Sequence, residues 1–357
     1  MRVSGRLTAR PQRRPRDLIV ILDGTMSTLV PGRETNAGMT YQLLTEQGPR
    51  ADRAVFYEAG VQWEDWRGMG DVMYGRGINR QIERAYGFLS STYKPGDRIY
   101  LFGFSRGAFA VRSLAGVIDK VGLITGPCAT HRKVAEAYRH YRCSPDSDAA
   151  QAFRRNYCMT DVTIKMIGVW DTVKSLGIRA PVLWRFSQPA HEFHNHHLSS
   201  VVEHGYHALA LDETRMAFKP ELWDAPEGWE GKVEQMWFAG THGDVGGQIQ
   251  GYQPARNLAN IPLVWMLDKA HGCGLTLPEG WKDRYPTDPL APSVGLSQGW
   301  AKLFLARARR IVGRYPSEQI HPMAMLRDRL RARIPDTVLL PSVTSEDDLD
   351  PNAVSPS

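Results

Sequence analysis

The stretch that decides the fold is RIYLFGFSRGAF, residues 98–109, in which an apolar run leads into GFSRG and then into a second apolar segment. GFSRG matches G-x-S-x-G, a nucleophile elbow that holds a serine in a strained turn between a strand and a helix. An ordinary turn is the alternative, because a chain with 33 glycines can match this pattern by accident. The expected strand–helix junction favours a nucleophile at Ser105.

Apolar runs on both sides of this stretch predict the architecture. Residues 18–22, 98–102, 162–170 and 233–239 are expected strands, and residues 78–93 and 108–120 are expected amphipathic helices. Strands that alternate with helices indicate a mostly parallel sheet with helices on both faces. We therefore expect one α/β domain with insertions, resembling an α/β-hydrolase.

Charge separates the two ends of the chain from this domain. Residues 1–16 contain six arginines and no acid, whereas residues 335–357 contain five acids and no Lys or Arg. We expect a disordered basic arm over 1–16, a catalytic domain over 17–334 and a disordered acidic tail over 335–357. The body is modestly basic, which suits peripheral contact with an anionic lipid surface, and no nucleic-acid partner is expected.

Targeting signals and cysteine pairs are not evident in the sequence. The arm is not followed by a signal-peptide pattern, and no apolar run approaches the roughly 18 to 20 residues of a membrane span. The four cysteines form no CxxC pair. We expect a chain made in the cytoplasm, with reduced thiols and no required metal or organic cofactor.

A serine nucleophile needs a base and an acid, which follow it in this fold in the order Ser, Asp, His. Asp171 comes just after one predicted strand and His242 just after the next. The alternatives are a helix-cap or turn acid at Asp171 and a structural loop histidine at His242. His321 is a second candidate base, ranked lower because it is expected to open a helix rather than to follow a strand.

Backbone N–H groups near the serine are the expected oxyanion donors. One is the N–H of Arg106, and the other is that of Gly24 or Thr25, in the loop after the first strand. Asp23 is expected to support that loop. An Asp-Gly turn with no catalytic part is the alternative there.

Three further polar residues are expected to support the site. Asp244 could compete with Asp171 as the acid, but its position two residues from His242 favours a role within its own loop. Asp212 and Arg215 lie in a helix-like stretch with His204 and His207, and they are interpreted as bracing the site or as a surface ion pair.

Three segments suggest other chemistry. HEFHNHH, residues 191–197, invites a metal interpretation but departs from HExxH. The glycine-rich residues 68–77 lack the spacing of a phosphate-binding loop and are expected to form a rim of the site. Residues 300–314 are amphipathic and basic, and are interpreted as a helix that packs on the sheet or lies on a membrane.

Six blocks of the sequence together resemble a known family. They are ILDGT, YLFGFSRGAFAVRSLAGVI, GVWDTV, HALALDETRMAF, WFAGTHGDVGG and EQIHPMAML, and they run from about residue 18 to residue 326. The chain resembles a family of α/β-hydrolases that includes the phospholipase effectors of bacterial type VI secretion.

The resemblance implies a serine acyl hydrolase with Ser105 as nucleophile, Asp171 as acid and His242 as base. It also implies that the expected substrate is a phospholipid acyl ester. It further implies export, with a secretion adaptor and an immunity protein as partners. The alternatives are an esterase or thioesterase that acts on small soluble substrates, and an inactive hydrolase fold that serves as a binding module.

Overall fold

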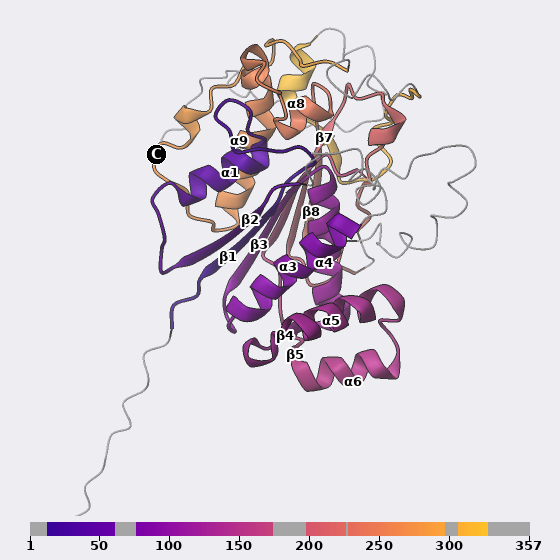
Figure 1. Cartoon of the computed structure of the whole chain (residues 1–357). Helices are drawn as coiled ribbons and strands as arrows, with labels where there is room; N and C mark the ends of the chain where they lie inside the picture. Colours follow the sequence, from indigo (N-terminus) through magenta and orange to yellow (C-terminus); the bar gives the residue numbers. More distant parts are fainter. Residues whose placement is uncertain (1–12, 61–75, 174–197, 226–227, 297–305, 328–357) are drawn as a thin grey trace, which may run out of the picture.

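A computed structural model of the chain describes residues 13–60, 76–173, 198–225, 228–296 and 306–327 (Figure 1). Seven parallel strands form the main sheet in the order β2-β1-β3-β6-β7-β8-β9. Their bounds are β1 Asp17–Leu22, β2 Arg53–Glu58, β3 Arg98–Phe104, β6 Met166–Trp170, β7 His204–Ala210, β8 Lys232–Phe238 and β9 Glu318–Ile320. The prediction of an α/β fold with a mostly parallel sheet is confirmed.

Helices cover both faces of this sheet. The α-helices are α1 Asn36–Thr45, α3 Arg76–Thr92, α4 Arg106–Val121, α5 His131–Cys143, α6 Asp148–Tyr157, α8 His242–Gly246 and α9 Arg256–Gly272. Short 3₁₀ helices span Gly126–Cys128, Met216–Phe218, Gln253–Ala255, Lys282–Arg284 and Pro322–Leu326, and β4 Leu123–Ile124 pairs with β5 Cys158–Met159.

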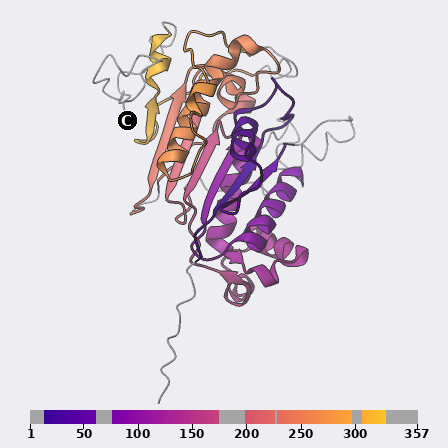
Figure 2. The same cartoon turned by 90° about the vertical axis from the view of Figure 1, so that its left-hand side faces the viewer.

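The alternation of side chains along β1 shows how the two faces form. Ile19 and Ile21 pack in the cluster that includes residues of α1 and α9, whereas Leu18, Val20 and Leu22 pack in the cluster of α3 and α4. Figure 2 shows α9 lying over the strands from one side. Because β1 is buried on both faces, its sequence is the continuous apolar run described above.

Three local predictions were wrong. The third strand begins at Met166 rather than at residue 162, although Ile164 forms an isolated bridge with Val202. The stretch from His204 to Ala210, interpreted as helix-like, is the buried strand β7, because its spacing of apolar residues also fits a period of two. Of the predicted helix at residues 300–314, residues 306–314 form no helix, and residues 300–305 lie outside the described residues.

The ends of the predicted domain are partly within the described residues. Arg13 and Arg16, placed in the basic arm by the sequence, both contact the buried carboxylate of Asp97. The acidic tail lies outside the described residues. Among the helices in the described part of the chain, we find none with the length and apolarity that a membrane crossing requires.

Candidate active site

The GFSRG stretch forms a tight turn between β3 and α4. Ser105 has φ 55° and ψ −116°, a strained conformation of a kind that costs about 1–3 kcal/mol. A Cβ on Gly107 would lie 2.0 Å from the carbonyl oxygen of Leu22, and one on Gly103 would lie 2.6 Å from that of Gly107. The two glycines are therefore required for α4 to pack against β1 and β3 at this turn.

Ser105, His242 and Asp171 form a continuous chain of hydrogen bonds. Nε2 of His242 lies 2.9 Å from Oγ of Ser105, and Nδ1 of His242 lies 2.6 Å from Oδ2 of Asp171. The three residues follow β3, β8 and β6, whose carboxyl ends meet at one edge of the parallel sheet. This edge is the upper one in Figure 1, where α8 also lies.

The His242 imidazole lies between two aromatic rings. Its centroid is 4.8 Å from that of Phe104 and 4.6 Å from that of Phe218. His242 is only 4 % exposed. The apolar faces restrict the ring to the plane in which its two nitrogens reach Ser105 and Asp171.

Asp171 is fully buried in a strained turn and accepts four hydrogen bonds. Its φ is 40°, and besides His242 it is contacted by the N–H of Ala210 and twice by Arg310. Burial by itself raises the pKa of this carboxyl, but the Arg310 charge and the hydrogen bonds from His242 and Arg310 outweigh it and hold the pKa well below its usual range. Asp171 is therefore ionised.

Arg310 was missed by the sequence analysis. Its side chain is 5 % exposed and reaches Asp171 from residues 306–316, which the sequence assigned to an amphipathic helix with Arg310 on the solvated face and Ile311 on the apolar face. Ile311 is 60 % exposed instead. A lone arginine in an extended segment carries no sequence pattern that marks it as a carboxylate partner.

The supporting residues hold the backbone around His242. Asp244 accepts from the N–H and the hydroxyl of Thr241 in its own loop, and also from the hydroxyl of Ser293 and the N–H of Val294. Asp212 accepts from the N–H of Gly240. Arg215 pairs with Glu213, not with Asp212 as one interpretation had it, and Glu213 also accepts from the N–H of His242.

The loop after β1 lies beside the nucleophile. A Cβ on Gly24 would be 3.3 Å from Cβ of Ser105, and Gln248 fixes the loop by donating to the carbonyl oxygen of Thr25. The N–H of Gly24 donates to Oδ1 of Asp23, which leaves the N–H of Thr25 as the candidate oxyanion donor of this loop.

Asp23 ties this loop to the rest of the fold. Its carboxylate also accepts from the hydroxyls of Thr35 and Tyr57. Burial raises the pKa of Asp23 to about 6, despite the opposing hydrogen bonds from Thr35, the N–H of Gly24 and Tyr57.

Arg106, which follows Ser105 in the sequence, is a buried arginine. The residue is 7 % exposed, and burial lowers the pKa of its guanidinium to about 10. Across the described ranges, its guanidinium makes no ion pair or hydrogen bond. A buried cation without a carboxylate is costly, and it is therefore suited to an anionic ligand.

His321, the second candidate base, lies elsewhere. It opens a 3₁₀ turn, but it also directly follows β9. The expectation that His321 does not follow a strand was therefore wrong. Its ring stacks on Phe238 and its Nδ1 accepts from the N–H of Met323. Burial lowers the pKa of His321 to about 4, so it is a neutral structural histidine at pH 7.

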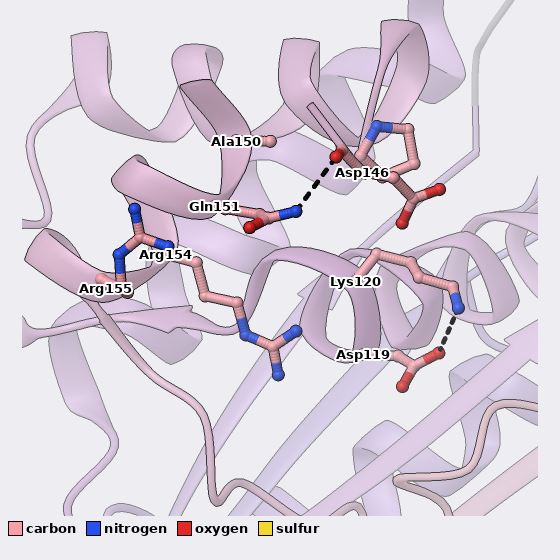
Figure 3. A pocket seen from close by; sticks show the side chains of 8 residues that line it. Asp119, Lys120, Asp146, Ala150, Gln151, Arg154 and Arg155 are labelled. Atoms are coloured by element: carbon pink, nitrogen blue, oxygen red, sulfur yellow. Dashed lines mark hydrogen bonds and ion pairs between the residues drawn. The ribbon is translucent and has the colours of Figure 1, made fainter. Parts of the chain in front are cut away.

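A hollow of about 470 Å³ lies far from these residues. Asp119, Lys120, Arg154 and Arg155 are among the residues that line it (Figure 3). Lys120 is at the opposite end of α4 from Ser105, roughly 22 Å away along a helix that rises 1.5 Å per residue. This hollow is therefore not part of the candidate active site.

The glycine-rich residues 68–75 and the histidine-rich residues 191–197 lie outside the described residues. Within the described part of the chain, no cluster of three or more His, Cys, Asp or Glu side chains is arranged to hold a metal ion.

Comparison with known proteins identifies the family. The profile described as "T6SS, Phospholipase effector Tle1-like, catalytic domain" matches residues 16–269, which is more than half of the chain. The chain belongs to this family. The predicted resemblance to the type VI secretion phospholipase effectors is confirmed.

Similar proteins differ from this chain in length. An uncharacterized protein of Saccharomyces cerevisiae is 32% identical over 228 residues, which cover 57% of this chain and 32% of the yeast protein. The solved structure of the Tle1 effector bound to the VgrG spike from the type 6 secretion system is 18% identical, with a TM-score of 0.38, over 67% of this chain and 52% of that chain. An uncharacterized protein from Pseudomonas aeruginosa is 14% identical, with a TM-score of 0.39, over 77% and 49% of the two chains. The chain thus spans about a third of the yeast relative and about half of the two solved chains.

Proposed function

We propose that the protein is a serine hydrolase that cleaves acyl esters of phospholipids through a covalent acyl-enzyme. The observation that carries the proposal is the hydrogen-bonded chain from Ser105 through His242 to Asp171, at the expected distances for a nucleophile, a base and an orienting acid. Membership of a phospholipase effector family supports the same reaction class.

The first half of the reaction forms the acyl-enzyme. Oγ of Ser105 attacks the ester carbonyl while Nε2 of His242 takes the hydroxyl proton, and Asp171 stabilises the imidazolium through Nδ1. The N–H groups of Arg106 and Thr25 donate to the oxyanion. The tetrahedral intermediate collapses, the bond between the acyl carbon and the alcohol oxygen breaks, and His242 gives its proton to the departing alcohol.

The second half releases the acid. A water molecule donates a proton to His242 and attacks the acyl carbon, after which the fatty acid leaves and the proton returns to Oγ of Ser105. The His242 ring keeps one orientation between Phe104 and Phe218, which suits a base that must act in both halves.

A phosphate-bearing substrate is supported by the buried charge of Arg106, the residue that follows Ser105. Within the described residues, the guanidinium of Arg106 makes no ion pair or hydrogen bond. In a glycerophospholipid the phosphate is separated from the scissile ester by only a few bonds. Guanidinium groups bind phosphate well because their planar forks match its oxygens.

A lipid-hydrolysis assay tests the substrate class. We expect the native chain to release fatty acid from phosphatidylglycerol or phosphatidylcholine in mixed micelles, faster than it cleaves p-nitrophenyl butyrate in solution. Ser105→Ala should lower the rate by about 10⁴- to 10⁶-fold. Equal or faster cleavage of the soluble ester would favour the esterase alternative, and activity that survives Ser105→Ala would exclude the serine mechanism.

The family also suggests how the enzyme is used. We expect peripheral contact with membrane lipid, export as a type VI effector, and binding to a secretion adaptor and an immunity protein. Co-purification of the chain with the spike protein encoded in the same genome tests binding to a secretion adaptor. Loss of both export and toxicity when that spike protein is deleted would support export through this adaptor.

A further inference from the structure

Arg310 makes four hydrogen bonds at the centre of the site, from a segment that the family match does not include. The matched region ends at residue 269. We propose that Arg310 is a positioning residue for the Asp171–His242 pair, so that the catalytic site is complete only with residues 306–316. This inference rests on the proposed function.

The guanidinium of Arg310 faces both oxygens of one carboxylate. Nη1 donates to Oδ1 of Asp171 at 2.5 Å, and Nη2 donates to Oδ2 at 2.8 Å. Oδ2 is also the acceptor for Nδ1 of His242. The two parallel bonds fix the plane of the carboxylate and so direct Oδ2 at the imidazole.

The same guanidinium also donates to two backbone carbonyl oxygens. Nη1 also donates to the carbonyl oxygen of Ala210 at 2.7 Å, and Nη2 to that of Phe218 at 2.5 Å. The Phe218 ring packs on His242. Arg310 therefore positions the carboxylate that His242 contacts and the backbone that carries the ring packed against it.

The segment that carries Arg310 is fixed on both sides. Upstream, the N–H of Ala308 donates to Thr214 and the N–H of Met216 donates to Ala306. Downstream, Glu318 accepts from the N–H groups of residues 313, 314 and 315. The position of Arg310 is therefore set by its backbone, not only by its attraction to Asp171.

Among the described residues, Arg310 is the cation that contacts the Asp171 carboxylate. Glu213, which contacts the backbone of His242, is already paired with Arg215. His207 accepts from the N–H of Thr172 and is neutral, because burial lowers its pKa to about 3. Within the described ranges, the fully buried carboxylate of Asp171 is thus paired with Arg310.

Removal of this charge has a defined consequence. Without Arg310, the buried Asp171 carboxylate loses this ion pair, and its negative charge then favours the protonated, inactive imidazolium of His242. The acid limb of the pH–rate profile should therefore move to higher pH. A misplaced carboxylate should also lower kcat, by about 100-fold for a displacement near 1 Å.

The test compares Arg310→Met and Arg310→Lys. The matched control is Arg309→Gln, because Arg309 is exposed on the same segment. The measurements are the rate of Ser105 labelling by a fluorophosphonate between pH 5 and 9, and kcat and KM on phospholipid in mixed micelles. The same labelling is repeated for Arg310→Ala with added guanidinium chloride at non-denaturing concentration.

We expect Arg310→Met to label about 100-fold more slowly at pH 7 and to show an acid limb at higher pH, with KM nearly unchanged. Arg310→Lys should keep the native acid limb with a smaller loss of kcat, because it keeps the charge but not the fork. Guanidinium should restore labelling of Arg310→Ala, and Arg309→Gln should match the native chain.

Native labelling rates and a native pH profile in folded Arg310→Met would overturn the proposal. If that variant does not fold, an Arg310→Lys variant with native kcat, or no rescue of folded Arg310→Ala by guanidinium, would overturn it as well. Absence of labelling in the native chain would instead contradict the proposed function, so the two failures are distinguishable.

Discussion

At the scale of single residues, the placement of the candidate nucleophile Ser105 depends on glycines that have no chemistry of their own. A Cβ on Gly246 would lie 1.9 Å from one edge of the Phe104 ring, and a Cβ on Gly24 would lie 2.6 Å from the other edge. Phe104 in turn packs under His242. The segments that follow β1, β3 and β8 therefore meet around Phe104.

Gly107→Ala should unfold the elbow. Its Cβ would overlap the backbone of Leu22, and we expect the free energy of unfolding to fall by about 3 kcal/mol or more. Gly87→Ala is the matched control, because its Cβ would meet nothing nearer than 3.7 Å inside α3, where alanine should stabilise by about 0.5–1 kcal/mol. Urea denaturation measures both, and equal stability of the two variants would refute the packing argument.

Arg106→Gln should change substrate preference. The variant keeps the backbone N–H but lacks the charge, so we expect KM for phospholipid to rise about 10- to 100-fold, as for loss of one charged hydrogen bond. Diacylglycerol, which has no phosphate, should be cleaved almost as by the native chain. Kinetics in mixed micelles distinguish the two, and an equal loss on both lipids would show that Arg106 does not bind phosphate.

At the scale of the elements, β7 is the strand whose nature the sequence concealed. His207 accepts at Nε2 from the N–H of Thr172, the residue after the candidate acid Asp171, at 3.1 Å. Its spacing from His204 suggested a helix face, but the sheet order places β7 between β6 and β8. A histidine that is buried in a strand and accepts from a neighbouring turn has no sequence signature.

His207 should make stability depend on pH. Its pKa is about 3 in the fold, below the 6.5 of an exposed histidine, so its contribution is fully present above pH 6.5 and is lost as pH falls towards 3. The native chain should lose about 2 kcal/mol at pH 5 through this group. His207→Gln keeps the acceptor but does not titrate, and should lose less between pH 7 and pH 5 in urea denaturation. An unchanged acid slope would contradict this.

At the scale of the whole molecule, the order of the strands explains why three distant residues meet. β3 and β6 are neighbours, and only β7 separates β6 from β8. Because all strands are parallel, the residues after each lie at the same edge of the sheet. The predicted order Ser105, Asp171, His242 therefore corresponds to the order of β3, β6 and β8 along one edge of the sheet.

The sequence predicted this edge well because its signals are local. The predicted strands at residues 98–102, 162–170 and 233–239 end close to the observed β3, β6 and β8, and the residue types that follow them give the candidate triad. It did not predict Arg310, since the pattern of residues 300–314 favoured an amphipathic helix with solvated cations. The extended path of residues 306–316 depends on bridges to Thr214 and Arg215, which only the tertiary structure provides.

Mapping of the residue that a fluorophosphonate modifies tests the central claim most directly. The account predicts that the native chain is labelled on the peptide that contains Ser105, that Ser105→Ala takes no label, and that His242→Ala labels at least 10⁴-fold more slowly, about the loss seen when a triad base is removed. A folded native chain that takes no label, or that is labelled at another serine, would contradict the claim that GFSRG presents an activated nucleophile.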